Sequence, residues 1–296
     1  AEADPVPGNT RIEVLGGDMR GRARSELDAP IRVRVTDSSG TALASVRVVW
    51  SALDGGRVTG GDRTDSLGNA EATWTLGARA GAQRVLVQVG NPRFIPAATV
   101  RATAEAGPAV SLEIRGGDRQ RAAAGTALAT PVLVQASDSL GNPAAGTRVI
   151  AKATAGTLAD TALTTDAHGV ATARWTLGVR PGEQRLELGL AERKIRVTVT
   201  ATARVGPLAS VTIRAAAPRA TGAQRLEAVA VDQHGNPVSD AMLQFSASTG
   251  ALSVAQAKTD PRGVAAVNWT GPTSMRTDAR ITVRAGGTRI AATHVV

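Results

Sequence analysis

Hydrophobic and polar residues alternate one by one over many short stretches of this chain. Clear cases are residues 31–36 (Ile-Arg-Val-Arg-Val-Thr), 70–74 and 208–214. A period of two is typical of β-strands that bury one face, because successive side chains of a strand point to opposite sides. Turn-forming sequences such as Asp-x-x-Gly, Gly-Asn-Pro and Gly-Gly separate these stretches. No stretch has helical spacing with a cap at each end, so the pattern predicts an all-β protein.

The strand pattern belongs to a unit that occurs three times. An Asp-x-x-Gly sequence is followed by Thr-Asp-x-x-Gly and then by a Trp-Thr pair, and the copies lie 101 and 195 residues after the first without an insertion. The repeated positions are Asp37, Asp138 and Asp232 for the first aspartate, Gly68, Gly169 and Gly263 for the second glycine, and Trp74, Trp175 and Trp269 for the tryptophan. Such a period indicates tandem domains of one architecture.

Two Gly-Pro pairs, at residues 107–108 and 206–207, mark the joints between the units. The predicted domains are therefore 1–106, with an N-terminal extension of 1–10, then 107–205 and 206–296. Roughly seven short strands in about 100 residues is the signature of an immunoglobulin-like sandwich. We therefore predict three tandem Ig-like β-sandwich domains in an elongated array, because short Gly-Pro joints favour semi-rigid connections.

The repeated residues have structural explanations in this fold. One inward-facing indole per unit fills core space that the Ala- and Val-rich sheets leave open. Each aspartate of an Asp-x-x-Gly turn accepts backbone N–H bonds, while the glycine adopts a positive φ. We expect the three indoles to be buried to the same depth.

The second unit resembles a known family. Residues 138–143 (Asp-Ser-Leu-Gly-Asn-Pro), 164–172 and the closing Trp-Thr-Leu-Gly are similar to the bacterial Ig-like domain of the Big-1 (invasin/intimin-like) type. The resemblance covers three tandem copies, although the third departs after its tryptophan, where it reads Gly271-Pro272. It implies an extracytoplasmic, disulfide-free rod segment or adhesive module. Members usually also carry an outer-membrane anchor and a lectin-like head, which these 296 residues do not contain.

The net charge of +9 does not indicate a nucleic-acid partner. Arginine supplies nearly all of the positive charge, since Lys152, Lys194 and Lys258 are the only lysines, and the surplus is spread thinly over the second and third units. The chain has four Trp, two Phe and no Tyr, so it lacks the aromatic residues on which bases stack. No apolar run approaches the roughly 20 residues of a membrane span.

Catalytic and metal chemistry find little support. The chain has no Cys and only three His, and it contains none of the common hydrolase, metalloprotease or nucleotide-binding motifs. We predict no enzyme activity and no cofactor. The repeated aspartates could ligate Ca²⁺, but each loop offers one carboxylate where a good site needs several. Turn capping is therefore the expected role, and no metal is predicted.

Two surface features are candidate partner-binding sites. A loop over residues 18–24 and its counterpart in the second unit gather guanidinium groups suited to carboxylates or phosphates. An insertion of two residues brings an apolar pair into a Pro-bounded turn at residues 90–96. The candidate residues are Arg20, Arg22, Arg24, Arg119, Arg121, Phe94 and Ile95. The alternatives are a solvated basic loop for the arginines and packing against the neighbouring unit for the apolar pair.

The function predicted from these observations is structural. The chain begins Ala1-Glu2-Ala3 without an initiator Met, which is what cleavage of a leader would leave. We expect an exported, non-enzymatic accessory subunit, periplasmic or at the cell surface, that docks on other protein chains of an extracytoplasmic assembly. A photosynthetic, respiratory or secretory membrane complex would fit. The alternative is a cell-surface adhesin or stalk module that binds glycan or host protein.

Overall fold

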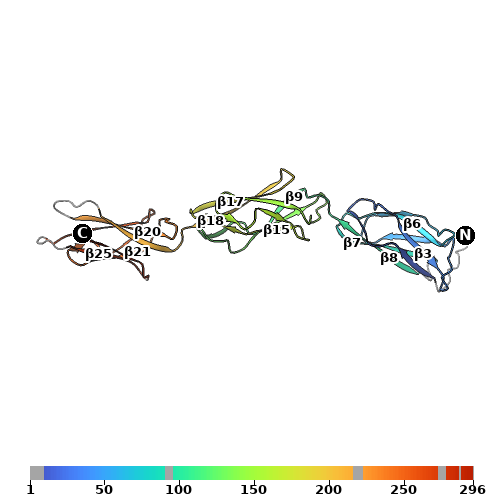
Figure 1. The fold of residues 1–296 in the computed structure, drawn as a ribbon, viewed down its shortest axis with the longest axis horizontal. Helices are drawn as coiled ribbons and strands as arrows, with labels where there is room; N and C mark the ends of the chain where they lie inside the picture. The colour runs from blue at the N-terminus through green and yellow to red at the C-terminus, as the bar shows by residue number, and fades with distance from the viewer. Residues whose placement is uncertain (1–9, 91–95, 216–222, 273–277, 287, 296) are drawn as a thin grey trace.

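The protein forms three β-sandwiches in a row, as Figure 1 shows. The structure, a computed structural model, describes residues 10–90, 96–215, 223–272, 278–286 and 288–295. Over these ranges the chain forms strands β1 to β26 and no helix. The prediction of an all-β fold with three tandem Ig-like sandwiches in an elongated array is confirmed.

The first sandwich packs a sheet of order β1-β3-β6-β5 against one of order β2-β8-β7-β4. Its strands are β1 (Arg11–Leu15), β2 (Met19–Arg22), β3 (Ile31–Thr36), β4 (Val48–Ala52), β5 (Arg57–Gly60), β6 (Asn69–Thr75), β7 (Gly81–Val89) and β8 (Ala97–Glu105). Neighbours are antiparallel except β2 and β8, which run parallel with Met19 opposite Ala102. The edge of β8 is thereby covered by β2.

The second sandwich repeats this plan with more strand breaks. Its sheets have the orders β15-β11-β9 and β10-β18-β17-β12-β14, with β13 and β16 forming a separate pair. Its strands are β9 (Ser111–Gly116), β10 (Gln120–Ala123), β11 (Val132–Ser137), β12 (Arg148–Ala153), β13 (Thr157–Leu158), β14 (Ala162–Thr164), β15 (Val170–Ala173), β16 (Trp175–Thr176), β17 (Gly182–Leu190) and β18 (Arg196–Arg204). Here β10 runs parallel to β18, as β2 does to β8.

The third sandwich has sheets of order β19-β20-β24-β22 and β23-β21-β25-β26. Its strands are β19 (Leu208–Ala215), β20 (Gln224–Asp232), β21 (Met242–Ala247), β22 (Ala251–Leu252), β23 (Gln256–Lys258), β24 (Val264–Thr270), β25 (Arg280–Ala285) and β26 (Ala291–Val295). Within the described ranges of this unit, β26 pairs with β25 and has no parallel partner of the β2 or β10 kind.

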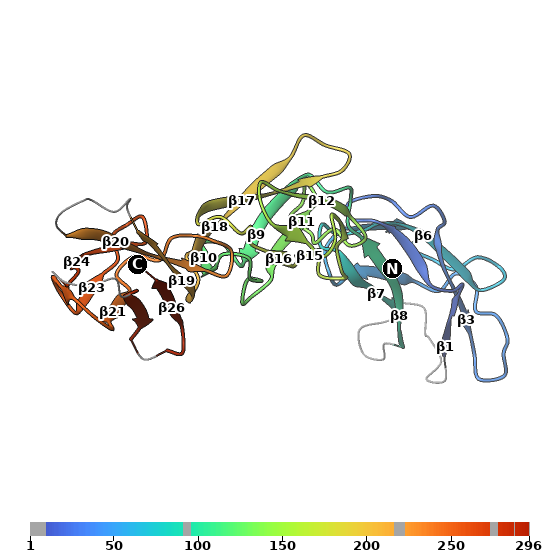
Figure 2. The same ribbon diagram turned by 60° about the vertical axis from the view of Figure 1, so that its left-hand side comes forward.

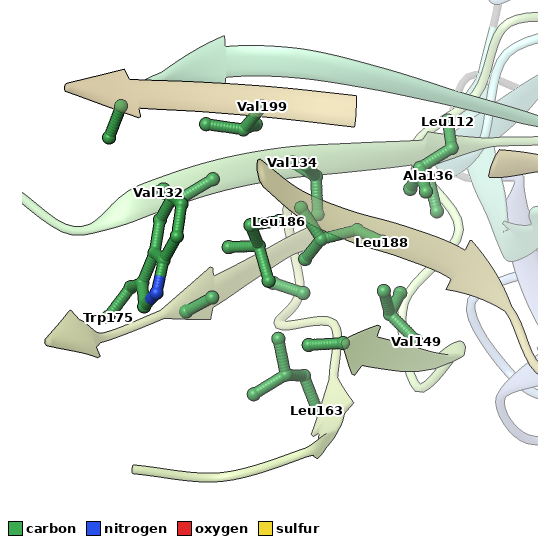
Figure 3. Close-up of a cluster of buried hydrophobic side chains, with 14 of the residues drawn as sticks. Leu112, Val132, Val134, Ala136, Val149, Leu163, Trp175, Leu186, Leu188 and Val199 are labelled. Atoms are coloured by element: carbon green, nitrogen blue, oxygen red, sulfur yellow. The ribbon is translucent and has the colours of Figure 1, made fainter. Parts of the chain in front are cut away.

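Each sandwich encloses its own hydrophobic core. Strand β3 shows how the alternation builds it, because Ile31, Val33 and Val35 are fully buried while the arginines between them face water. Figure 3 shows the second core, where Trp175 lies beside aliphatic side chains of both sheets. Burying one such aliphatic side chain contributes about 1.5–3 kcal/mol, so these cores supply the main stabilisation of a chain without disulfides.

The three indoles do not lie at equal depth. Trp74 and Trp175 are 0% and 2% exposed, but Trp269 is only partly buried. In the first two units the leucine two residues later, Leu76 or Leu177, is 1% exposed. The third unit has Gly271 at that position, so no side chain there covers the indole. The expectation of matching depth is wrong for the third unit.

The arginine-rich segments are strands rather than loops over much of their length. Residues 19–22 form β2 and residues 120–123 form β10, each hydrogen-bonded in parallel to the last strand of its unit. Gly21 faces the core, where an added Cβ would lie 3.0 Å from Leu27 Cδ2. The alternating pattern places Arg20 and Arg22 on the opposite, exposed side of β2.

Candidate functional site

The first Asp-x-x-Gly turn of each later unit lies at the joint with the unit before it, since the asparagine that follows it binds that unit. Figure 1 shows the two joints between the three sandwiches. In the second unit, Asp138 Oδ1 accepts the N–H groups of Leu140 and Asn142, both at 2.8 Å. Asp138 Oδ2 accepts the N–H of Gly107, in the linker, at 2.8 Å. One buried carboxylate therefore holds both its own turn and the linker that enters the unit.

Asn142 connects this turn to the preceding sandwich. Its Nδ2 donates to Ala78 O at 2.9 Å, and its Oδ1 accepts the N–H of Ala80 at 2.9 Å. Nδ2 also donates to Asp138 Oδ2 at 3.1 Å, and Asn142 is 7% exposed. A buried amide with all of these partners fixes a contact in one geometry, because leaving any of them unpaired costs free energy.

A glutamine of the preceding unit holds the loop that Asn142 binds. Gln83, 2% exposed, accepts the N–H of Gly77 at 2.7 Å and donates to Arg79 O at 2.6 Å. Gln184 makes the same pair of bonds, accepting from Gly178 N–H and donating to Arg180 O. Contacts within the preceding unit thus hold the backbone groups that face the next one.

The second joint uses the same kinds of aspartate and asparagine contact, but other residues surround them. Asp232 Oδ2 accepts the N–H of Gly206 at 3.0 Å, and Asn236 Nδ2 donates to Val179 O at 2.8 Å. His234, in the same turn, lies against Gly125 of the second unit, where any side chain would collide with the imidazole ring. This joint therefore relies on a close approach of a ring to a glycine in addition to the asparagine.

Hydrogen bonds to these turn carboxylates lower their pKa values. Burial alone would raise the pKa of Asp232, but bonds from the Asn236 side chain and from the N–H groups of Gly206, Asn236 and His234 outweigh it and lower the pKa to about 2. The pKa of Asp138 is also lowered, since bonds from Gly107 and Asn142 outweigh its burial. Both carboxylates are therefore ionised over the whole physiological range.

The first unit carries the turn without the joint residues. Asp37 Oδ1 accepts the N–H groups of Ser39 at 2.8 Å and of Thr41 at 2.9 Å. Thr41 occupies the position of the two asparagines. The Asp-x-x-Gly turn is thus common to all three units, while the asparagine occurs where a unit stacks on another.

The second repeated turn has a local role. Asp65, Asp166 and Asp260 each accept two N–H groups of their own turn, and Gly68, Gly169 and Gly263 have φ values of +76°, +70° and +74°. Each of these glycines also lies against the backbone of the neighbouring strand. Over the described part of the chain, no group of three or more His, Cys, Asp or Glu side chains could hold a metal ion.

The structure gives the predicted arginines different surroundings. Arg20 and Arg22 line a hollow of about 380 Å³ that three carboxylates, from Glu26, Asp28 and Glu105, also line. Arg24 has a positive φ of 65° and donates its N–H to Gly77 O, beside the first joint. The candidate arginines of the first unit thus lie close to carboxylates or to the joint.

The arginines of the second unit are separate from these. Arg119 has a φ of 55° and forms an exposed ion pair with Asp118 at 3.4 Å, and Arg121 is exposed on β10. Phe94 and Ile95 lie outside the described residues. No helix in the described ranges is long and apolar enough to cross a membrane.

The sequence analysis predicted joints at the two Gly-Pro pairs but not the hydrogen bonds that cross them, although the residues that form these bonds recur in the sequence. The Gly-Asn-Pro sequence after Asp138 and Asp232 and the glutamines at 83 and 184 are repeated features. Their partners are backbone groups of another unit, and a sequence pattern does not show which backbone groups meet.

Comparisons with known proteins define the fold. No protein-family profile and no curated protein matches the sequence. Among solved structures, the chain is similar to the Escherichia coli adhesin FdeC, with 18% identity, a TM-score of 0.65, and coverage of 100% of this chain and 99% of that one. It is also similar to Yersinia pseudotuberculosis InvD, with 15% identity, a TM-score of 0.58, and coverage of 99% and 98%. The fold is that of bacterial Ig-like tandem domains of the invasin/intimin type.

Proposed function

We propose that this chain, which has the fold of tandem Ig-like domains of the invasin/intimin type, is a non-enzymatic cell-surface module of the adhesin kind. Its three sandwiches act as a stiffened rod that spaces and presents binding surfaces to other proteins. The observation that carries the proposal is the joint at Asn142, whose amide binds Ala78 O and Ala80 N–H of the preceding sandwich. A module that only tethered two partners would need no buried hydrogen bonds between its domains.

The likeness to FdeC supports the same proposal. FdeC is an adhesin, and the structural match runs over this whole chain and almost the whole of that one. We carry the adhesin role over as part of the proposal, together with the export that such a role requires. We also propose domain limits at 106/107 and 205/206, which fall between the first core, ending at Ala104, the second, from Ala109 to Ala203, and the third.

Of the two functions predicted from the sequence, the comparisons favour the surface adhesin. Docking on a photosynthetic, respiratory or secretory membrane complex has no support among them. A periplasmic location likewise has none, so the proposal places the chain at the cell surface.

The proposal is tested by locating the chain on the cell and by measuring its adhesion to other cells. Antibodies against the purified chain are applied to intact producing cells and to a periplasmic extract, and beads coated with the chain are applied to cultured epithelial cells. We expect labelling of intact cells and adhesion of the beads above that of albumin-coated beads. An exclusively periplasmic chain, or one that co-purifies in fixed ratio with a membrane complex, would contradict the proposal.

A matched variant tests the rod itself. Asn142→Ala with Asn236→Ala removes both asparagine contacts, whereas Thr41→Ala changes the equivalent position where no such contact exists. We expect the double variant to adopt a wider range of overall lengths in small-angle X-ray scattering and Thr41→Ala to match the wild type. Equal scattering from all three proteins would show that the joints do not stiffen the chain.

A further inference from the structure

The outer face of the second sandwich has a hollow where a side chain is missing. In the row of outward-facing residues across β12, β17 and β18, Gly189 lies between Ile150 and Arg196. The first unit has Gln88 at the corresponding point, and the third has Arg284. The hollow measures about 430 Å³, and the turn between β17 and β18 overhangs it. Figure 2 shows this hairpin projecting from the side of the second sandwich.

Three of the cations that line the hollow have no side-chain partner among the described residues. Lys152 comes from β12, and Arg193 and Lys194 come from the hairpin turn. All three are exposed, and within the described part of the chain none has an ion pair or a side-chain hydrogen bond. Two of the three lysines of the whole chain are therefore placed at this one spot.

Carboxylates do not neutralise the hollow. Glu187 is engaged by Arg196 in an ion pair, which leaves Glu192 as the one free carboxylate among the described lining residues. An adjoining pocket of about 250 Å³ on the other side of the hairpin adds Arg148. The hollow near Arg20 and Arg22 differs, since three carboxylates share it. The second unit thus has a positive hollow, and converging cations of this kind attract polyanions.

The chemistry of the hollow favours a sulfated glycan among polyanions. Both strands beneath it, β12 and β17, are paired on both edges, so an acidic peptide would find no free backbone groups to extend the sheet. None of its described lining residues is aromatic, which disfavours nucleic acid and neutral sugars, since both bind through stacking. Sulfate groups along a flexible glycan need only spaced ammonium and guanidinium groups.

We propose that the hollow formed by Lys152, Arg193 and Lys194 around Gly189 binds a sulfated glycan. The proposal goes beyond the function above and does not depend on it, because the binding is a property of the purified chain.

The test uses the full chain and a fluorescein-labelled heparin oligosaccharide as the probe, followed by fluorescence polarisation. The combined variant Lys152→Gln, Arg193→Gln, Lys194→Gln should bind about tenfold more weakly, since it loses three exposed charge contacts. The combined control Arg101→Gln, Arg174→Gln, Arg214→Gln removes the same charge from exposed positions elsewhere. It should lose less than about threefold, because only the diffuse attraction changes.

Two further measurements separate a site from general charge. Gly189→Gln fills the hollow with the residue of the first unit and keeps every charge, and we expect it to weaken binding. Polyglutamate should compete poorly with the labelled probe. Equal losses in the two triple variants, unchanged binding by Gly189→Gln, or competition by polyglutamate as strong as by unlabelled heparin would each overturn the proposal.

Discussion

An aspartate that caps a turn has two oxygens, and at the joints of this protein the two bind different parts of the chain. Oδ1 of Asp138 and of Asp232 holds the turn, while Oδ2 holds the N–H of a linker glycine. The asparagine four residues later extends the network to the preceding sandwich. A few side chains at each joint thus determine both a local turn and the connection between two domains.

Removing the asparagine should loosen a joint without unfolding a unit. Asn142→Ala deletes the bonds to Ala78 O and Ala80 N–H but keeps the Oδ1 bonds of Asp138. We expect a loss of about 1 kcal/mol in the stability of the second unit. The chain has no cysteine, so one introduced cysteine in each of the first two units can carry a spin label. The distribution of distances between the two labels, measured by pulsed electron paramagnetic resonance, should widen. Thr41→Ala is the control and should leave that spread unchanged.

Acid should weaken the second joint through Asp232. The pKa of about 2 lies below the ordinary value of 3.8, so the ionised carboxylate stabilises the folded state above about pH 4. That contribution is lost as the pH falls from about 4 through 2. Over this range, the urea midpoint of the third unit should therefore drop less in Asp232→Asn than in the wild type. Trp269 fluorescence measures that midpoint.

The control for this experiment removes a different carboxylate of the same unit. Asp278 accepts no hydrogen bond within the described ranges, so Asp278→Asn should keep the acid dependence of the wild type. A wild-type midpoint that stays constant between pH 4 and 2 would argue against the role of Asp232.

At the level of elements, the sequence predicts the strands that alternate cleanly and misses those that depend on a distant partner. Residues 31–36 alternate between Arg or Thr and branched aliphatics, and they form β3. Residues 19–22 read Met-Arg-Gly-Arg, which by itself is typical of a loop. They become a strand because β8 offers a free edge some 80 residues later, and Gly21 lets the strand approach Leu27 and Leu76.

The hydrogen bonds across the joints could not be predicted from the sequence for the same reason. The Asp-x-x-Gly pattern contains enough information for a turn, because its partners lie two and four residues away. The partners of Asn142 lie 62 and 64 residues away in another unit. The depth of Trp269 also depends on a neighbour, since the third unit has Gly271 where the other units have the buried Leu76 and Leu177.

Gly156, just before β13, lies very close to the backbone of residues 176–178, and a substitution tests how tight this approach is. Gly156 has a φ of +80°, and an added Cβ would collide with Thr176 O and lie 2.7 Å from Gly178 N. Gly141 has a φ of +81°, but nothing lies within 4 Å of an added Cβ. Gly141→Ala should cost about 1 kcal/mol from the backbone alone, and Gly156→Ala at least twice that.

Urea unfolding of the two variants, followed by the fluorescence of Trp175, measures the difference. The two glycines have nearly the same φ, so each variant serves as the control of the other. Equal losses would mean that the backbone near Thr176 shifts freely and that the crossing is not tight.

At the scale of the whole molecule, the three sandwiches have separate cores of unequal size. Among the described residues, the buried cluster holds 16 residues in the first unit, 20 in the second and 11 in the third. The third unit also lacks a described parallel strand beside β26. Because the joints consist of a few polar contacts, each core should unfold largely on its own.

The third unit should therefore unfold first. Tryptophan reports each unit separately, since Trp269 is in the third, Trp175 in the second, and Trp50 and Trp74 in the first. Each tryptophan is measured in a variant whose other tryptophans are replaced by Phe. We expect the fluorescence of Trp269 to change at a lower urea concentration than the fluorescence of Trp175. A single transition shared by both would instead mean that the joints couple the units into one cooperative body.

At both joints the asparagine binds main-chain groups of the preceding unit, namely Ala78 O, Ala80 N–H and Val179 O. Main-chain groups are the same whatever side chains surround them. A duplicated gene segment can therefore add one more sandwich if its neighbour keeps the glutamine that holds this loop and, at a joint like the second, the glycine that faces the imidazole ring. Recombination can thus adjust how far such a protein reaches, one domain at a time.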